Sequence, residues 1–202
     1  LVLAVPGTSP VKTYADFVEL AKSKGKSGKG MDYGTGGVGA LPHVTMELLR
    51  ERLGKPPMNH VPYKGSSPAV TDLIAGRLDA LFDATSVLVP FTKSGQLRPI
   101  LVTSDKRVPA FPDVPTSSEV GLKDFNIISF IGLYGPPKLP ADIVAKANAA
   151  MNTALKDPSV TKTIADRGDE PGGGTPEQLA ELTRTHHKTW GEVVKANNIR
   201  AD

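Results

Sequence analysis

Between an apolar segment and a helical pattern, the chain reads Tyr33-Gly34-Thr35-Gly36-Gly37-Val38-Gly39-Ala40. Glycines let the backbone turn tightly and expose consecutive N–H groups, and the N-terminus of the following helix adds a partial positive charge. Such a turn is suited to bind a carboxylate or phosphate, and Thr35 adds a hydroxyl donor. The structural alternative is a plain tight turn before a helix, although four glycines in six residues exceed what a turn requires.

On both sides of this stretch, apolar segments alternate with helical patterns. We predict strands at residues 1–5, in a segment ending at Tyr33, and at residues 59–63, 78–83, 100–103 and 126–133. We predict helices from Thr13 to Gly25, directly after the glycine-rich turn, at residues 67–75 and at residues 86–93. Repeated β-α units indicate an α/β fold with a mostly parallel sheet flanked by helices.

Beyond residue 106 the pattern of strands and helices changes. Three prolines between residues 107 and 116 exclude a regular helix or a central strand there. After residue 137 the pattern predicts helices only, at residues 141–155, in a short segment ending at Asp166, and at residues 176–197. The change in composition near residue 130 predicts a domain boundary.

Composition excludes several classes of protein. With 202 residues, of which 39% are hydrophobic and 22% charged, the chain can build a core and is not a disordered segment. The net charge of +3 comes from basic residues scattered singly, which argues against nucleic acid as a partner. The absence of cysteine excludes disulfides, thiolate metal sites and cysteine nucleophiles. No apolar run is long enough for a membrane span. Because the chain starts at Leu1, we expect it to be part of a longer reading frame.

Ligands of open α/β sheets bind beyond the carboxyl ends of the strands, so the loops after Tyr63 and Asp83 are further candidates. Ser66 or Ser67 can cap the next helix, and capping is the structural interpretation favoured for Ser67. Asp83 can cap a helix or receive a ligand hydroxyl or ammonium, and Thr85 follows it. His43 can donate to a bound anion or pack and bond to the backbone, and the second interpretation is favoured.

Read literally, Gly34-x-Gly36-x-x-Gly39 also matches the dinucleotide fingerprint, so an NADP-binding oxidoreductase fragment is the alternative function. That motif expects an acidic residue at the end of the next strand, where this chain has Pro62, Tyr63 and Lys64. No hydrolase elbow, Walker loop or metal-binding motif occurs, and the paired His186 and His187 lack further ligands nearby. We therefore predict no catalytic residue, no metal site and no cofactor.

Several motifs resemble the Bug family, the TctC-type solute-binding proteins of tripartite tricarboxylate transporters. The residues that carry the resemblance are the glycine-rich stretch with His43 and Glu47, His60-Val61-Pro62-Tyr63-Lys64-Gly65 followed by Pro68-Ala69, Asp72-Leu73, Asp79 to Asp83, Val102-Thr103-Ser104, Phe111-Pro112-Asp113-Val114-Pro115-Thr116 and Gly132-Leu133. The matches run along the whole chain, and their combination is far more specific than the glycine-rich stretch alone.

The resemblance implies a type II periplasmic-binding-protein fold of two α/β lobes. Residues 6–128 would form one complete lobe that carries the anion loop. Residues 1–5 and 129–202 would supply crossover strands and the C-terminal, mainly helical remainder of the other lobe. On this interpretation the chain is truncated and lacks the N-terminal part of the first lobe and the export signal. The incomplete lobe would then cover its edges by rearrangement or by pairing in a homo-oligomer.

The resemblance also implies a non-enzymatic, periplasmic function. The protein would capture a small carboxylate, such as a di- or tricarboxylate or an aromatic or amino acid carboxylate, and deliver it to membrane transporter subunits. A binding module recruited for sensing is a further alternative. The residues expected to bind the ligand are Thr35, Gly36, Gly37, Val38, Gly39, Ala40, His43, Ser66, Asp83, Thr85 and Phe130. At Phe130 the family commonly has a larger aromatic residue.

Overall fold

The computed structural model describes residues 1–200, which divide into two compact units. The first unit contains Leu1–Ser129 together with the segment that starts at Val193. The second unit contains Phe130–Glu192. None of the helices in the described part of the chain is both long and apolar enough to cross a lipid bilayer.

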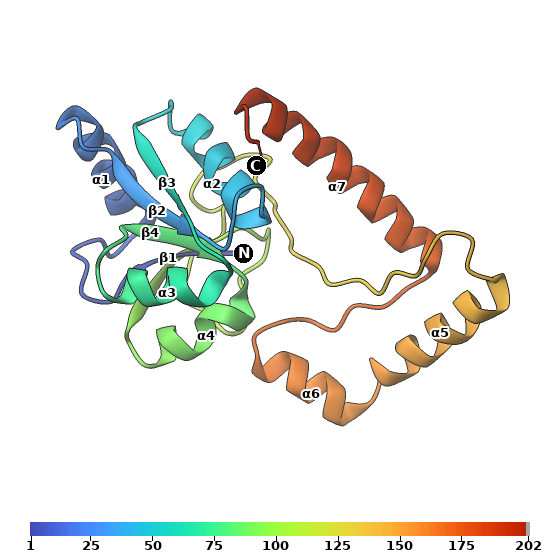
Figure 1. The fold of residues 1–202 in the computed structure, drawn as a ribbon. Helices are drawn as coiled ribbons and strands as arrows, with labels where there is room; N and C mark the ends of the chain where they lie inside the picture. Colours follow the sequence, from blue (N-terminus) through green and yellow to red (C-terminus); the bar gives the residue numbers. More distant parts are fainter. Residues whose placement is uncertain (201–202) are drawn as a thin grey trace. The chain divides into compact units, whose positions relative to one another are not determined.

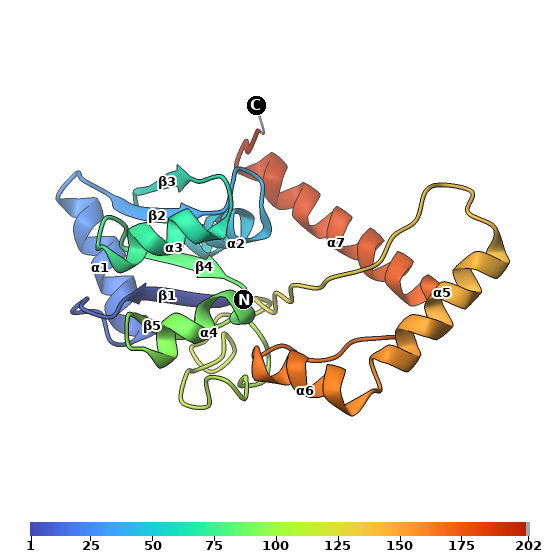
Figure 2. The same ribbon diagram turned by 60° about the horizontal axis from the view of Figure 1, so that its bottom comes forward.

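The first unit is built on a five-stranded sheet with the order β3-β2-β4-β1-β5 (Figure 1). The strands are β1 (Val2–Pro6), β2 (Met31–Thr35), β3 (Met58–Pro62), β4 (Ala80–Asp83) and β5 (Leu97–Val102). Strand β2 pairs in parallel with β3 and with β4, whereas β1 pairs antiparallel with β4 and with β5. Figure 2 shows β1 lying between β4 and β5. The sheet is therefore mixed: four strands run in one direction and β1 runs against them.

Helices cover both faces of this sheet. They are α1 (Tyr14–Lys26), α2 (Leu41–Arg52), α3 (Ser66–Ile74) and α4 (Thr85–Lys93). Neighbouring residues of β2 point to opposite faces: the Tyr33 hydroxyl bonds to Glu47 of α2, whereas a Cβ on Gly34 would meet Ala69 of α3. On the face of α3, buried apolar residues of α3 and α4 pack against Val2, Ala4 and Leu81. The sheet is thus the middle layer of a three-layer α/β unit.

The amino end of α1 shows how local sequence sets a helix boundary. Thr13 Oγ1 accepts a hydrogen bond from the Asp16 N–H at 3.1 Å, and Asp16 Oδ2 accepts one from the Thr13 N–H at 2.9 Å. These reciprocal bonds form the capping box that the spacing of the two residues predicted. At the other end, Gly25 lies within the helix, which continues to Lys26.

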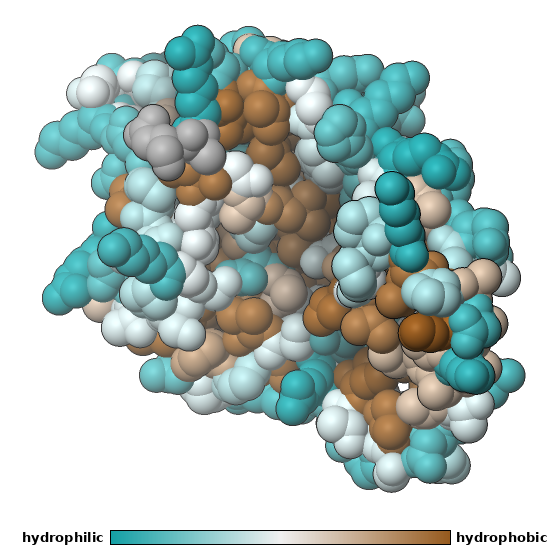
Figure 3. All heavy atoms as spheres, turned by 45° about the vertical axis from the view of Figure 1, so that its right-hand side comes forward, coloured by the Kyte–Doolittle hydropathy of each residue, from teal (hydrophilic) through white to brown (hydrophobic). Residues whose placement is uncertain are grey.

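The second unit contains α5 (Ala141–Ala154), α6 (Pro158–Asp166) and most of α7 (Pro176–Ala196). None of these three helices has a buried residue within the described chain. Exposed apolar side chains of this unit include Ile131, Leu133, Tyr134, Ile143, Met151 and Leu182. Figure 3, which brings this side of the molecule forward, shows apolar residues gathered at the surface.

The predicted strand at residues 126–133 is wrong, because the structure has no strand between residues 103 and 140. Ile127 alone is tied to the sheet region, since its N–H donates to the Thr103 carbonyl and its carbonyl accepts from the Thr103 hydroxyl. Ile131 is fully exposed and Leu133 is 64% exposed. An apolar segment needs a neighbouring strand to become a strand, and within residues 1–200 this segment has none.

Candidate functional site

The glycine-rich loop connects β2 to α2 at the carboxyl edge of the sheet. Thr35 is the last residue of β2, and Leu41 is the first residue of α2. Gly37 has a φ of 149° and Gly39 a φ of 75°, which are backbone conformations that favour glycine. Val38 and Gly39 are exposed, and Gly36, Gly37 and Ala40 are half-buried. The loop is therefore accessible to a small solute.

The second loop, after β3, packs directly against the first. The Gly65 N–H donates to the Gly36 carbonyl at 2.9 Å. A Cβ added to Gly36 would lie 3.2 Å from the Gly65 carbonyl carbon and 3.2 Å from the Ser66 nitrogen. Gly36 is therefore needed for the close approach of the two loops, because a larger residue would force them apart.

The third loop, after β4, is joined to the second through Asp83. Asp83 is buried, and its Oδ1 accepts a hydrogen bond from the Ala84 N–H at 2.8 Å. Burial raises the pKa of the Asp83 carboxyl, and a hydrogen bond with the Ser66 side chain opposes that rise. Thr85 is the first residue of α4 and is half-buried beside these groups. The structure thus brings Ser66, Asp83 and Thr85 together with the glycine-rich loop at one edge of the sheet.

Three helices begin at this edge without compensation of their positive ends. The N-cap residues of α2, α3 and α4 are Ala40, Gly65 and Ala84, and none provides a side-chain cap. None of the three helices has an acidic residue in its first turn, all of which the structure describes. Since β3, β2 and β4 are adjacent and parallel, these helix ends share one edge. Pro42 and Pro68 have no N–H, and the N–H groups of His43 and Val87 donate to the carbonyls of Ala40 and Ala84. The first-turn donors that this edge can offer to an anion are therefore the N–H groups of Leu41, Ser66, Ser67, Thr85 and Ser86.

This finding corrects two expectations about capping. Ser67 does not cap α3, because the helix begins at Ser66 and its N-cap is Gly65. Asp83 does not cap α4 from the N-cap position, which Ala84 occupies; its carboxyl binds the N–H of Ala84 itself. Both errors have the same cause, since each helix begins one or two residues away from the position that the polar residue suggested.

The Thr35 hydroxyl serves the loop itself. Its side chain is buried, and Oγ1 donates to the Gly37 carbonyl at 3.1 Å and accepts from the Gly37 N–H at 3.3 Å. The same oxygen lies 2.6 Å from Nε2 of His60, with the direction of donation set by the imidazole tautomer. Thr35 therefore holds the turn in place, and its expected hydrogen bond to the ligand stays a prediction.

Below the loop lies a buried polar layer. His43 Nδ1 accepts the Gly39 N–H at 3.0 Å, so this histidine bonds to the backbone, and its expected contact with the ligand stays a prediction. Its ring stacks on His60 with centroids 3.7 Å apart, and the Tyr33 hydroxyl donates to Glu47 Oε1 at 2.6 Å. Burial lowers the pKa of His43, and it lowers the pKa of His60 to about 4 with a contribution from His43.

His60, Tyr33 and Glu47 are not among the ligand-binding residues that the sequence predicted. The signal that could have pointed to them is that Tyr33 and His60 both lie in predicted strands; in the structure, Tyr33 of β2 is directly opposite His60 of β3. A polar residue opposite an aromatic on a buried face requires a partner. The helix positions of His43 and Glu47, four residues apart, place that partner on α2.

Phe130, the last of the predicted ligand-binding residues, belongs to the second unit. There its ring meets His186 edge-on, with centroids 5.1 Å apart, and His186 accepts the Trp190 indole N–H at 3.3 Å. His186 thus has an aromatic environment. Within residues 1–200, no group of three or more histidine and acidic side chains is arranged to hold a metal ion.

The dinucleotide interpretation does not fit this geometry. In that motif the third glycine permits close packing of helix against strand. A Cβ on Gly39 would meet no atom within 4 Å, so glycine is required there by its φ of 75° and not by close packing. The end of β3 also lacks the acidic residue that would bind a ribose, since Pro62 is followed by Tyr63 and Lys64.

Comparison with known proteins gives a consistent result over the full chain. The chain is 40% identical over 186 residues to the UPF0065 protein in the TAR-I ttuE-ttuC' intergenic region of Agrobacterium vitis, a match that covers 91% of this chain and 53% of the relative. The chain thus spans about half the length of this relative.

Two solved structures are similar in fold and in sequence. The first is R. palustris Rpa4515 with adipate, at 30% identity and a TM-score of 0.89, with 98% of this chain and 65% of that chain covered. The second is MatC from Rhodopseudomonas palustris with bound malate, at 30% identity and a TM-score of 0.83, with 96% and 65% covered. The model of the tripartite tricarboxylate transporter family receptor, TctC, matches residues 1–199. The chain therefore belongs to the TctC family of tripartite tricarboxylate transporter receptors.

Proposed function

We propose that this chain is the carboxylate-gripping part of a periplasmic solute-binding protein and performs no catalysis. The observation that carries the proposal is the convergence of three helix N-termini, uncapped by side chains and free of first-turn acids, around one glycine-rich loop. A carboxylate bound there receives backbone N–H donors and neutralises the positive helix ends. Backbone amides bind and release a carboxylate without changing it chemically.

The substrate class that we favour is a dicarboxylate. One family member with a solved structure holds adipate, and another holds malate. The two ligands differ in chain length and in hydroxylation and share two carboxylates. The loop described here fits the shared group, because backbone donors recognise a carboxylate without reading the rest of the molecule.

We propose membrane transporter subunits as the partner, in the periplasm, in keeping with the receptor description of the family. For the domain organisation, we propose that residues 6–128 are one complete lobe and that residues 1–5 and 129–202 belong to the other. The lack of buried residues in α5, α6 and α7 supports this assignment, because half a lobe has no core of its own.

The apolar surface of the second unit could instead be buried against a second copy of the chain, in a homo-oligomer. Light scattering after size exclusion tests it directly. A concentration-dependent dimer supports homo-oligomerisation, and a monomer over a hundredfold range of concentration contradicts it.

Calorimetric titration of the 202-residue chain with adipate and malate tests the proposed function. Adipamide, which keeps the length of adipate but carries no charge, is the matched control ligand, and NADP tests the oxidoreductase alternative. We expect heat of binding with at least one dicarboxylate and none with adipamide or NADP. Equal binding of adipate and adipamide, or binding of NADP alone, would overturn the proposal.

A further inference from the structure

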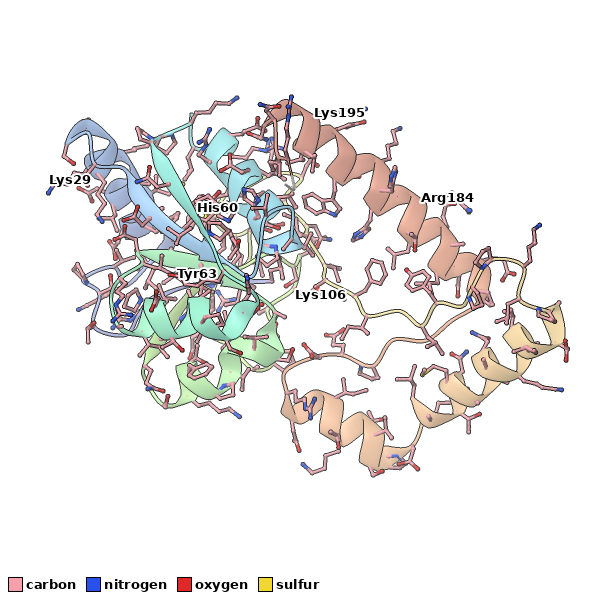
Figure 4. All side chains as sticks on the ribbon, viewed as in Figure 1. Lys29, His60, Tyr63, Lys106, Arg184 and Lys195 are labelled. Atoms are coloured by element: carbon pink, nitrogen blue, oxygen red, sulfur yellow. The ribbon has the colours of Figure 1, made fainter. Side chains whose placement is uncertain are left out.

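His43 and His60 form a stacked pair beneath the glycine-rich loop. His43 comes from α2 and His60 from β3, and Figure 4 labels His60 on that strand. The ring centroids are 3.7 Å apart and the ring planes differ by 17°. The ring of Tyr33 stacks on His60 with centroids 5.1 Å apart and is tilted against His43, 6.3 Å away. Three rings from two strands and one helix thus form a floor under the loop.

Each imidazole contacts one end of the loop. His60 Nε2 lies 2.6 Å from the hydroxyl of Thr35, which precedes the consecutive glycines. His43 Nδ1 accepts the N–H of Gly39, the last glycine of the loop, at 3.0 Å. Thr35 links His60 to Gly37, because the N–H and the carbonyl of Gly37 both hydrogen-bond to the Thr35 hydroxyl. The pair therefore determines the orientation of the peptide groups on both sides of Val38.

We propose that the stacked pair His43–His60 is the positioning device that holds the glycine-rich loop in its carboxylate-binding conformation. The inference rests on the proposed function, and it deepens that function by assigning a role to two residues that do not themselves bind the carboxylate. Glycines have the largest conformational freedom of any residue, so an unbraced loop of this composition would lose affinity through the entropy of ordering it.

The geometry requires both rings to be neutral. Nδ1 of His43 can accept the Gly39 N–H only while it carries no proton, and two stacked imidazolium rings would repel each other. The charged groups that face the pair are Glu47, which favours a charged His43, and Arg50, which pairs with Glu47 at 3.3 Å. Burial outweighs Glu47 and lowers the pKa of both histidines, so the neutral pair persists at neutral pH.

A positioning role and direct electrostatic attraction predict opposite effects of histidine protonation on the affinity for the carboxylate. If the histidines attracted the carboxylate directly, protonating them would strengthen binding. If they position the loop, protonation breaks the contact with Gly39 and releases the loop, which weakens binding. Substitutions that keep the hydrogen-bonding atom but remove the titration separate these roles at a single pH.

The variants are therefore matched in pairs. His43→Asn keeps an acceptor near the position of Nδ1, and His43→Leu removes it; His60→Gln keeps a polar atom near the position of Nε2, and His60→Leu removes it. His187→Leu, at an exposed position on α7, is the control for the same chemical change away from the loop. Circular dichroism establishes that each variant is folded before it is compared.

The first measurement uses no ligand. Amide hydrogen exchange of Gly37 and Gly39, followed by NMR at pH 7, reports whether the loop is held. We expect exchange to become at least about tenfold faster in His43→Leu and to return toward the wild-type rate in His43→Asn. Unchanged exchange in His43→Leu would overturn the inference regardless of what the loop binds.

The second measurement is the affinity for adipate and malate at pH 7. We expect His43→Leu and His60→Leu to weaken binding about tenfold, and the Asn and Gln variants to stay within about threefold of wild type. Wild-type affinity in both Leu variants would overturn the inference. If wild type binds neither dicarboxylate while the exchange result holds, the proposed function fails and the positioning of the loop by the pair stands.

Discussion

The helices that begin at the carboxyl edge of the sheet differ from all the other helices of the described chain in how their N-termini are treated. Helices α1, α5, α6 and α7 each have an acidic residue at the N-cap or in the first turn, namely Asp16, Asp142, Asp157 and Glu177. Helices α2, α3 and α4 have none, and their N-caps are Ala40, Gly65 and Ala84. Among the helices of residues 1–200, only the three that begin at this edge lack an acidic residue at the N-cap or in the first turn.

Local stability is given up at this edge of the sheet. A side-chain cap in place of Ala stabilises a helix by about 1 kcal/mol, whereas Gly at the N-cap is only a few tenths of a kcal/mol worse than such a cap, so Ala40, Ala84 and Gly65 together forgo about 2 kcal/mol. That is a substantial part of the 5–15 kcal/mol typical of a folded domain. A bound carboxylate can supply the missing acceptors, and the free energy forgone in the unliganded state then appears as affinity.

The largest effect is expected from closing the space between the first two loops. Gly36→Val places a branched side chain against Gly65 and Ser66, where even a Cβ meets backbone at 3.2 Å. The loops must separate, and we expect adipate affinity to fall at least about 100-fold, which corresponds to roughly 2.7 kcal/mol. Calorimetry measures the loss. Gly172→Val is the matched control, because a Cβ on Gly172 meets nothing within 4 Å. Equal affinities of the two variants would show that the loop contact is not part of the site.

The next effect comes from giving α2 the compensation that the other helices have. Ala40 has the extended backbone of an N-cap residue, with φ −61° and ψ 154°. Ala40→Asp is expected to stabilise the chain by about 1 kcal/mol and to weaken dicarboxylate binding about tenfold, because the new carboxylate neutralises the positive helix end and repels the ligand. Ala40→Asn caps without charge, and we expect it to weaken binding about threefold. Tighter binding by Ala40→Asp would refute the claim that the helix end is reserved for an anion.

A smaller effect, on stability alone, is expected from the capping box of α1, a helix that has an acidic residue in its first turn. Thr13→Ala removes both bonds of the capping box of α1, and we expect urea denaturation to show a loss of about 1 kcal/mol in the free energy of unfolding. Dicarboxylate affinity should stay within about twofold of wild type, since α1 does not begin at the candidate site. Thr153→Ala is the control, because its hydroxyl bonds only to the Ala149 carbonyl of its own helix. A tenfold loss of affinity in Thr13→Ala would remove the distinction between the two groups of helices.

Most of the secondary structure and the position of the loop could be predicted from the sequence, because they depend on local patterns. Apolar periodicity and glycine placement predicted β2, the loop and α2 directly. Strand direction is a tertiary property, so the antiparallel β1 could not be predicted from its five apolar residues. The segment around Ile131 was predicted as a strand because the pattern does not reveal whether a neighbouring strand exists.

In the candidate site, too, the residues marked by local sequence pattern could be predicted, and the contacts that depend on tertiary structure could not. Gly36, Gly39 and Ala40 were identified because glycine patterns mark a turn before a helix. The contact of Thr35 with His60 could not be predicted, because His60 is distant in sequence and comes close only through the pairing of β2 with β3. The lack of caps on α3 and α4 could not be predicted either, since Ser67 and Asp83 stand close to both helix starts and only the backbone shows that neither caps.

The smallest effect is expected from Asp83, the acidic residue nearest to the uncapped helix ends. Burial raises the pKa of its carboxyl, so the folded chain holds this proton more tightly than the unfolded chain does. The stabilising contribution is therefore full at pH values below the unfolded pKa and is lost as the pH rises through the folded pKa. Asp83→Asn keeps the oxygen that accepts the Ala84 N–H and removes the titration. Urea denaturation from pH 3 to pH 7 should show the variant gaining stability relative to wild type as the pH rises, by less than about 1 kcal/mol, because the Ser66 and Ala84 hydrogen bonds offset part of the burial. A variant that instead loses stability relative to wild type with rising pH would mean that the Asp83 carboxylate is held as an anion at this edge, so that its own negative charge supplies the compensation that α4 otherwise lacks.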